Sequence, residues 1–418
     1  LRLDGLGRFF AAIVATLWPL TVLYAFSYLQ NDTRKRSFFA FFTMSYGATL
    51  GVALAGDLFT MYCFYELLTL CTVPLVLHTR TKEATRAAKT YFVFSLGGAA
   101  FAFASMLFLV SNGVTVDFAL GGLLHRYPYG QKYLTYVFYL LGFFGFGVKA
   151  AVFPACRWLP KASAAPTPVT ALLHAVAVVK AGAFACIRLV YYSYGTELLR
   201  GTWAQTVCIV LALVTILYGS CMSLKQRHFK RRLAYSTISN LSYILFAAVL
   251  MTGDALAAAF LHLITHSVVK IMAFFAAGAV LHYAHREYVD ELEGLARHMP
   301  VTFACVIAAA CGLTGIPPFQ GFVSKWYIAS AAVAAGDGLA LAGFAVLLVS
   351  ALLTAIYMFQ VVIKAYFPRR TAIPPAADSV REAGWQMTVP MVILAAAGLL
   401  LGMFPQWLLD VIGRAVTL

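Results

Sequence analysis

Charge is scarce in this sequence. Only 11% of the 418 residues are Asp, Glu, Lys or Arg, whereas 62% are hydrophobic. A soluble domain of this size could not hide so much apolar surface. A helix that crosses the hydrocarbon core needs about 20 apolar residues, and such runs recur along the chain. They are continuous rather than alternating, which excludes a transmembrane β-barrel. The sequence therefore predicts an all-α polytopic membrane protein.

Acidic residues are scarcer still. There are 16 Asp plus Glu against 31 Lys plus Arg, a formal charge of +15. Such a balance in a soluble protein would suggest nucleic acid as a partner, but in a membrane protein basic residues collect in the loops that stay in the cytoplasm. We therefore expect the lipid bilayer and other membrane subunits as partners, and no nucleic acid.

Cysteine patterns typical of cofactor sites are absent. The eight cysteines nearly all lie in apolar runs, and no two form a CxxC pair. Cysteine in such a setting behaves as a small hydrophobic residue. The pattern predicts no disulfide framework, zinc site or iron–sulfur cluster, and hence no cofactor in this chain.

The apolar runs predict about twelve membrane spans. We expect the first to be a spanning helix rather than a signal peptide, because no small-residue cleavage site follows it. The predicted limits are 8–29, 38–56, 58–78, 88–112, 132–156, 166–192, 203–223, 233–252, 255–284, 300–333, 340–367 and 386–407.

The loops between these spans alternate in charge. Loops after odd-numbered spans are basic, whereas loops after even-numbered spans are nearly uncharged. The one mixed loop, from His285 to His298, carries four acidic residues beside Arg286 and Arg297, but acidic residues weigh little in the positive-inside rule. The positive-inside rule then predicts cytoplasmic odd loops and both termini outside, in the inner membrane of a bacterial or archaeal cell. The basic residues lie at 32–36, 80–89, 157–161, 225–232 and 369–370, and the sparse charges of the other loops include Asp117, Arg126, Glu197, Asp254 and Asp337.

Two spans carry helix-breaking residues. The fifth reaches Pro154, and the tenth contains the run Gly315-Ile-Pro-Pro-Phe-Gln-Gly321. Interrupted segments at corresponding positions of two halves are typical of inverted-repeat transporters. We expect two inverted five-helix repeats at 38–192 and 203–367, each with one broken helix. The segments 1–37 and 368–418 would each supply a flanking helix.

Several ionisable residues fall inside predicted spans, where a charge is costly and marks a functional candidate. Glu66 and Lys149 each stand far from other charges, and Lys180 shares its span with His174. Lys325 is alone in the tenth span, and a position near a helix end would let Lys180 or Lys325 reach the interface. If Glu66 meets Lys149, the pair stabilises both charges, and its opening and closing would switch a neighbouring proton site. A static ion pair that joins two helices is the alternative.

The ninth predicted span carries three titratable residues on one helical face. His262, His266 and Lys270 follow one another at intervals of four residues. They form a ladder of groups that can exchange protons. Two histidines at this spacing could also chelate a metal, but Lys270 would repel a cation. His174 and Lys180 are six residues apart, so either their helix is distorted or they face different partners.

These motifs resemble the antiporter-like subunits shared by respiratory complex I, membrane-bound hydrogenases and Mrp-type Na⁺/H⁺ antiporters. The similarity covers nearly the whole chain and keeps the family's order. The matching runs are Leu3-Asp-Gly-Leu6, Phe64-Tyr-Glu-Leu67, Val148-Lys149 with Phe153-Pro154 and Trp158-Leu-Pro160, Ala165 to His174, Ala234 to Ser239, His262 to Lys270, and Gly315 to Lys325.

The resemblance implies roles for these residues. Glu66 and Lys149 match the family's coupling pair, and Lys325 matches its terminal lysine on the second broken helix. The central proton carriers match His174, Lys180, His266 and Lys270. Where many members have His and Asp, this chain has Cys156 and Lys161, which weakens any path through them. Few residues follow Trp407, so we expect no long lateral helix and an inner or single antiporter-like position.

Three functions compete. The first is a proton-translocating subunit of a redox-driven complex, whose iron–sulfur, NiFe or flavin centres would lie in partner subunits. The second is a subunit of an Mrp-type Na⁺/H⁺ antiporter, and the third is a structural subunit with a vestigial channel. The set Glu66, Lys149, Lys180, Lys270 and Lys325 argues against the third, but it does not separate the first two. Na⁺ would prefer oxygen ligands, whereas most of these candidate residues offer lysine or histidine nitrogen, which favours H⁺ as the ion.

Overall fold

The computed structural model describes residues 1–122, 132–368 and 380–416, and within these ranges every regular element is a helix. Arg126, Arg369 and Arg370 lie outside them. The longer helices are α1 (Gly5–Tyr28), α2 (Lys35–Leu54), α3 (Leu58–Val76), α4 (Lys82–Ser111), α5 (Lys132–Lys149), α8 (Val178–Arg188), α10 (Trp203–Lys225), α11 (Phe229–Val249), α12 (Gly253–Ala279), α13 (Pro300–Thr314), α14 (Gln320–Ala335), α15 (Gly338–Tyr366), α16 (Trp385–Met403) and α17 (Pro405–Val416).

Short elements fill the turns and the breaks. The α-helical ones are α6 (Trp158–Ala162), α7 (Thr167–Ala175) and α9 (Thr196–Leu199). The others are the 3₁₀ turns η3 (Ala155–Arg157), η6 (Val289–Glu291) and η7 (Leu295–Arg297), and the π-helical turns η4 (Leu189–Tyr194) and η5 (Val280–Ala284).

Polar side chains begin many of the helices. Asp4 accepts the Gly7 N–H at the start of α1, and Asp57 accepts the Thr60 N–H at the start of α3. Thr81 and Thr252 do the same for α4 and α12. Each cap satisfies an N–H that has no partner within its helix, and thereby fixes where the helix starts.

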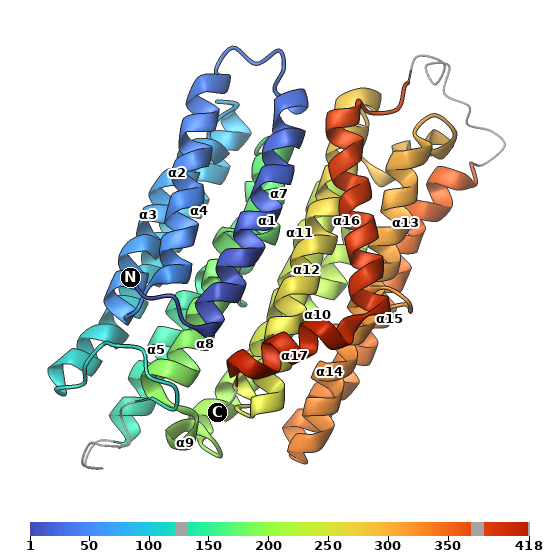
Figure 1. Cartoon of the computed structure of the whole chain (residues 1–418). Helices are drawn as coiled ribbons and strands as arrows, with labels where there is room; N and C mark the ends of the chain where they lie inside the picture. The colour runs from blue at the N-terminus through green and yellow to red at the C-terminus, as the bar shows by residue number, and fades with distance from the viewer. Residues whose placement is uncertain (123–131, 369–379, 417–418) are drawn as a thin grey trace.

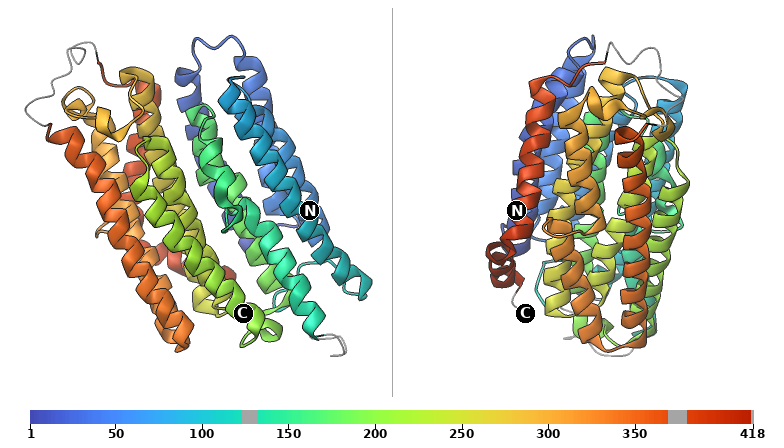
Figure 2. Two further views of the ribbon diagram at one scale, coloured as in Figure 1. Left: turned by 180° about the vertical axis from the view of Figure 1, so that it is seen from behind. Right: turned by 90° about the vertical axis from the view of Figure 1, so that its right-hand side faces the viewer.

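The helices stand side by side in two groups. Helices α1–α9 form one group and α10–α17 the other, as Figure 1 shows from the front and Figure 2 from behind. The groups meet where α7 and α8 pack against α11 and α12, and where α1 packs against α16. The segments Thr167–Tyr194 and Gly253–Ala284 are almost completely buried, although both are apolar enough to span a membrane. These two segments form the centre of the molecule.

Nine helical segments in the described ranges are long and apolar enough to cross a membrane. They correspond to nine of the twelve predicted spans. The other three predicted spans are also helical but depart from a simple apolar rod. The first part of the fifth span ends at Lys149, and the tenth is divided into α13 and α14. The eighth, predicted at 233–252, corresponds to α11, which begins earlier and includes the basic run Lys230 to Arg232.

The predicted breaks are real. α5 stops at Lys149, and the chain passes Pro154 before α6 begins. α13 stops at Gly315, whose φ of +90° suits a residue without a side chain, and two prolines separate it from α14. A further interruption, between α7 and α8, falls between His174 and Lys180.

The basic loops gather at one end of the bundle. Asp32 bonds to His78 at 2.9 Å, and the Phe229 N–H donates to the Glu287 carbonyl at 2.9 Å. Arg231 pairs with Glu83. We call this end the basic face; it comprises the loops at 29–34, 77–81, 163–166, 226–228 and 285–299.

The C-terminal helix differs from the expected course of the twelfth span. α16 ends at Met403, and Trp407 lies in α17 rather than at the end of a span. α17 runs crosswise to the bundle and packs against α1, α12 and α16 (Figure 1). Its apolar residues include Leu408 and Ile412, which are buried.

Candidate functional site

Lys149 and Glu66 meet. The Lys149 Nζ lies 3.0 Å from Glu66 Oε1 and also donates to the Tyr65 carbonyl. The ammonium stands 3.3 Å from the centre of the Tyr65 ring, which adds a cation–π contact. Lys149 is completely buried, whereas the Glu66 side chain keeps 22% of its surface exposed. The carboxylate end of the pair is therefore partly accessible at the surface of the chain, whereas the ammonium end is enclosed.

The break in the fifth predicted span positions Lys149. The chain leaves the helix at this residue, and the Trp158 indole N–H donates to the Val148 carbonyl at 2.8 Å. Gly182 on α8 permits the close approach of the central helix, because a Cβ there would lie 2.5 Å from the Ala150 nitrogen. Thus Lys149 lies between the outer helix α3 and the central helix α8.

Lys180 and His266 join the two groups of helices. The Lys180 Nζ on α8 lies 2.8 Å from His266 Nδ1 on α12, and both side chains are buried. One hydrogen bond holds one proton, so either an ammonium donates to a neutral imidazole or the imidazole donates to a neutral amine. The contact therefore joins two groups that can both titrate. Lys180 therefore does not reach the membrane interface, which the sequence left open as a possibility.

His262 continues this site towards α14. Its ring lies 5.9 Å from that of His266, and its Nδ1 lies 2.9 Å from the Ser324 hydroxyl. The predicted one-face ladder on α12 is present, but its members contact different helices. Lys270, the third member, donates to the Leu233 carbonyl of α11 at 3.0 Å.

His174 lies on the other side of the interruption from Lys180. Its Nε2 is 3.4 Å from the Ser163 hydroxyl, and its ring packs on Phe274 of α12. The six-residue spacing of His174 and Lys180 left two explanations open, and both apply. The helix is interrupted between the two residues, and they contact different partners. His174 is close enough to Lys270 and Lys230 to interact with them electrostatically.

The buried lysines and histidines at the centre of the molecule form what we call the central axis, which consists of His174, Lys180, His262, His266 and Lys270. Within the described part of the chain, three imidazole nitrogens of this axis are buried without a hydrogen-bond partner. They are His174 Nδ1, His262 Nε2 and His266 Nε2. Most buried polar atoms in proteins are hydrogen-bonded, so these nitrogens distinguish this cluster from an ordinary helix interface. The described residues hold no group of three or more His, Cys, Asp or Glu side chains that could bind a metal ion.

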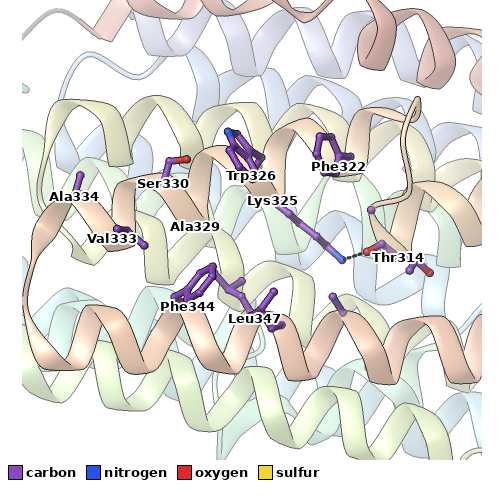
Figure 3. A pocket seen from close by; sticks show the side chains of 13 residues that line it. Thr314, Phe322, Lys325, Trp326, Ala329, Ser330, Val333, Ala334, Phe344 and Leu347 are labelled. Carbon is purple, nitrogen blue, oxygen red and sulfur yellow. Dashed lines mark hydrogen bonds between the residues drawn. The ribbon is translucent and has the colours of Figure 1, made fainter.

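Lys325 lies at the end of a cavity between α13, α14 and α15. Its Nζ donates to the carbonyls of Leu313 and Thr314, at 2.6 and 3.0 Å. These carbonyls end α13, and a cation is favourable at a helix C-terminus. Figure 3 shows the side chain reaching back from α14 towards Thr314. The cavity is about 680 Å³, and apolar side chains such as Phe322, Trp326 and Leu347 line most of it.

Sequence reasoning missed three buried cations among the described residues, Arg188, Lys230 and Arg232. Arg188, at the end of α8, is fully buried and forms a two-fold ion pair with Asp4, and its guanidinium lies over the rings of Phe118 and Tyr192. Lys230, on α11, is 6% exposed and donates to the Ala165 carbonyl at 2.9 Å. In the sequence, Lys230 stands in a basic run, and such runs usually form exposed loops. The sequence pattern therefore gave no indication that Lys230 is buried.

The family model described as "NADH:quinone oxidoreductase/Mrp antiporter, TM" matches residues 55–354. The chain belongs to this family. The matched region covers most of the chain and includes Glu66, Lys149, the central axis and Lys325.

Curated relatives extend the match to the rest of the chain. NADH-quinone oxidoreductase subunit N of Desulforudis audaxviator is 33% identical over 98% of this chain and 83% of that protein. NADH-quinone oxidoreductase subunit L of Mycobacterium tuberculosis is 32% identical over 99% of this chain but 65% of its own length. A Na⁺/H⁺ antiporter subunit of Alkalihalophilus pseudofirmus is 31% identical over 96% of this chain, and the chain spans 52% of it.

Solved structures share the fold. A chain of the archaeal membrane-bound sulfane sulfur reductase superposes with a TM-score of 0.86 at 24% identity, covering 99% of this chain and 82% of that one. A chain of the Mrp complex from Dietzia superposes with a TM-score of 0.83 at 24% identity, covering 98% and 83%. This chain is thus an antiporter-like, multi-pass membrane subunit of the family that complex I and Mrp antiporters share.

Proposed function

We propose that this chain translocates protons as a membrane subunit of a redox-driven complex of the complex I or membrane-bound hydrogenase type. The observation that carries the proposal is the Lys180–His266 contact, a hydrogen bond between two titratable groups that joins the two groups of helices. His262, Lys270 and His174 extend it in both directions along buried segments. A structural subunit has no need for so many buried titratable side chains, each of which costs free energy.

The Lys149–Glu66 pair supplies the switch. With the pair closed, Glu66 stabilises the Lys149 charge at 3.0 Å. When Glu66 moves away, Lys149 keeps only the Tyr65 carbonyl and ring in a buried site, and burial disfavours its charged form. The partly exposed Glu66 side chain faces outwards, where a neighbouring subunit could draw it away.

The architecture proposed is that of twelve spans in two inverted five-helix repeats, 38–192 and 203–367. The support is that the fourth predicted span of each repeat is broken, α5 with α6 in the first and α13 with α14 in the second. Segments 1–37 and 368–418 flank the repeats. Interrupted helices of this kind are a common feature of transporter sites.

The orientation proposed is with the basic face in the cytoplasm and both termini outside. The support is that the basic loops, which lie far apart in the sequence, meet at one end of the bundle. Positively charged loops are retained on the cytoplasmic side of a cell membrane.

Protons are the proposed ion. The axis residues offer lysine and histidine nitrogens, whereas Na⁺ in transporters is held by oxygen atoms. Redox centres, whether iron–sulfur, NiFe or flavin, would belong to partner subunits. The relatives named as quinone oxidoreductase subunits support this assignment.

An Mrp-type antiporter is the second candidate, and one observation favours it. The Na⁺/H⁺ antiporter relative from Alkalihalophilus pseudofirmus matches almost the whole chain at 31% identity, close to the values for the oxidoreductase subunits. The residues of the central axis are compatible with both assemblies, so they do not distinguish a redox-driven complex from an Mrp-type antiporter.

Purification of the native assembly in mild detergent, followed by mass spectrometry of each subunit, tests the assignment. We expect iron–sulfur, NiFe or flavin proteins to co-purify. An assembly of small membrane subunits without a redox protein would overturn the redox-driven proposal and favour the antiporter.

A further inference from the structure

The cavity beside Lys325 is elongated, apolar along most of its length and polar at one end. Its volume is about 680 Å³, a usual size for a small-molecule site. The Lys325 ammonium and Thr314 lie at one end, and Val333 and Ala334 lie towards the other (Figure 3). Lys325 and Ala334 are nine residues apart on α14, which corresponds to about 13 Å along the helix. The cavity therefore has the shape that suits a chain-like ligand.

The polar end of the cavity offers two hydrogen-bond donors. The Lys325 ammonium has three N–H groups, and the carbonyls of Leu313 and Thr314 accept two of them. The Thr314 hydroxyl is buried and has no hydrogen-bond partner. Within the described ranges Lys325 forms no ion pair with a carboxylate. A cation beside an unpartnered hydroxyl suits a carboxyl group, whose oxygens accept hydrogen bonds from both.

The cavity opens on an exposed apolar surface. Phe322, Trp326 and Val333 of α14 and Leu348 of α15 line it, and all four side chains are exposed. Leu347, on its inner wall, is buried. The exposed apolar sides of α14 and α15 face hydrocarbon in a membrane-spanning chain. A ligand would therefore enter from the bilayer rather than from water.

We propose that this cavity binds a long-chain fatty acid from the bilayer. The carboxyl oxygens accept hydrogen bonds from Lys325 and Thr314, and the acyl chain lies along α14 towards Val333. The acid crosses the hydrocarbon in its neutral form, because a charged carboxylate is costly there. Binding is non-covalent. The inference goes beyond the proposed function and does not depend on it.

A photoreactive fatty acid that carries a diazirine in its acyl chain tests this site in the native assembly, reconstituted into lipid vesicles. After irradiation and proteolysis, mass spectrometry locates the labelled residues. We expect saturable labelling of cavity walls such as Phe322 and Leu347, displaced by excess unlabelled palmitic acid. Equal labelling of exposed apolar residues outside the cavity, such as Leu352 and Val392, would overturn the proposal.

The contact with the carboxyl group is tested by a second probe and a substitution. The matched photoreactive fatty alcohol has the same chain without a carboxyl group, so it should label the cavity at least about tenfold less. Lys325→Gln should lower labelling by the fatty acid to a similar extent. Equal labelling by acid and alcohol, or full labelling of Lys325→Gln, would show that the cavity takes acyl chains of any head group and would overturn the proposal.

Two further variants complete the test. Ala329→Leu keeps Lys325 and adds volume to the cavity wall, so labelling should fall, and full labelling would overturn the proposal even where Lys325→Gln does not assemble. Lys364→Gln removes a lysine of α15 outside the cavity and should leave labelling unchanged. Subunit composition, measured first, establishes that each assembly is intact. Because labelling is measured without transport, failure of the proposed function would not alter these outcomes.

Discussion

The two predicted halves hold their buried cations in different ways. In the first half, Lys149 pairs with Glu66, and Arg188 pairs with Asp4 of the flanking segment 1–37. In the second half, the buried Lys270 and the partly buried Lys325 bind main-chain carbonyls. The sequence shows the reason, because the acidic residues between 203 and 367 fall in loops or at helix ends and not within the spans.

The difference has a mechanistic meaning. A carboxylate partner can move away and change the local field by a full charge, whereas a carbonyl belongs to the backbone and offers only a fixed dipole. The first half is therefore suited to switching and the second to passing protons on. The Lys180–His266 contact lies between them and belongs to both.

The largest effect is expected at Lys149. Lys149→Ala removes the cation of the switch and leaves Glu66 without its partner, so proton transport should fall to background while the subunits still assemble. Proton uptake into sealed vesicles, with subunit composition as the control, measures this. Uptake at the wild-type rate would show that the first half does not switch.

Lys325→Gln tests the corresponding site of the second half. The amide keeps a donor for the Leu313 and Thr314 carbonyls, so the end of α13 should remain satisfied and thermal stability should change by less than about 1 kcal/mol. Transport should nevertheless be lost, because an amide does not titrate. A normal rate in the vesicle assay would assign Lys325 a purely structural role.

Glu66→Gln should give a smaller loss of transport. Lys149 keeps its bond to the Tyr65 carbonyl, so its position is retained while the countercharge disappears. We expect a decrease of about tenfold, equivalent to about 1.4 kcal/mol in the barrier. The same assay measures it, and an unchanged rate would favour a static pair that only joins α3 and α5.

Asp4→Asn tests the other carboxylate pair, between Arg188 of the first half and Asp4 of the flanking segment 1–37. Arg188 would remain buried with a neutral partner, which lowers stability by about 2–3 kcal/mol, less than for a fully enclosed pair because Asp4 is 25% exposed. Thermal unfolding of the detergent-purified assembly measures the loss. A midpoint equal to that of the wild type would remove any structural role for the pair.

An exposed pair at the basic face gives the smallest effect. The hydrogen bond from Lys364 holds the pKa of Asp290 below its ordinary value. Both side chains are partly exposed, so Lys364→Gln should lower stability by at most about 1 kcal/mol at neutral pH. This contribution exists above the ordinary pKa of Asp290 and is lost as the pH falls through its lowered value. Unfolding curves of both proteins should therefore converge in acid, and a constant difference would contradict the assignment.

Hydropathy and spacing were enough to predict the helical membrane fold, the two broken spans and most of the axis residues, because each of these leaves a signal within one short stretch of sequence. The one-face pattern of His262, His266 and Lys270 is such a signal, and so is the proline run after Gly315. Span ends were less certain, as α17 shows, since a short amphipathic helix and the end of an apolar span have similar composition.

The sequence by itself determined which residues are titratable, which helices break and where basic residues collect. Only the tertiary structure decided which group each of them meets. Lys180 bonds to His266 across 86 residues, Lys230 is buried although it lies in a basic run, and Arg188 finds Asp4 across 184 residues. Such contacts depend on how helices far apart in the chain pack together, and no local pattern of residues specifies that arrangement.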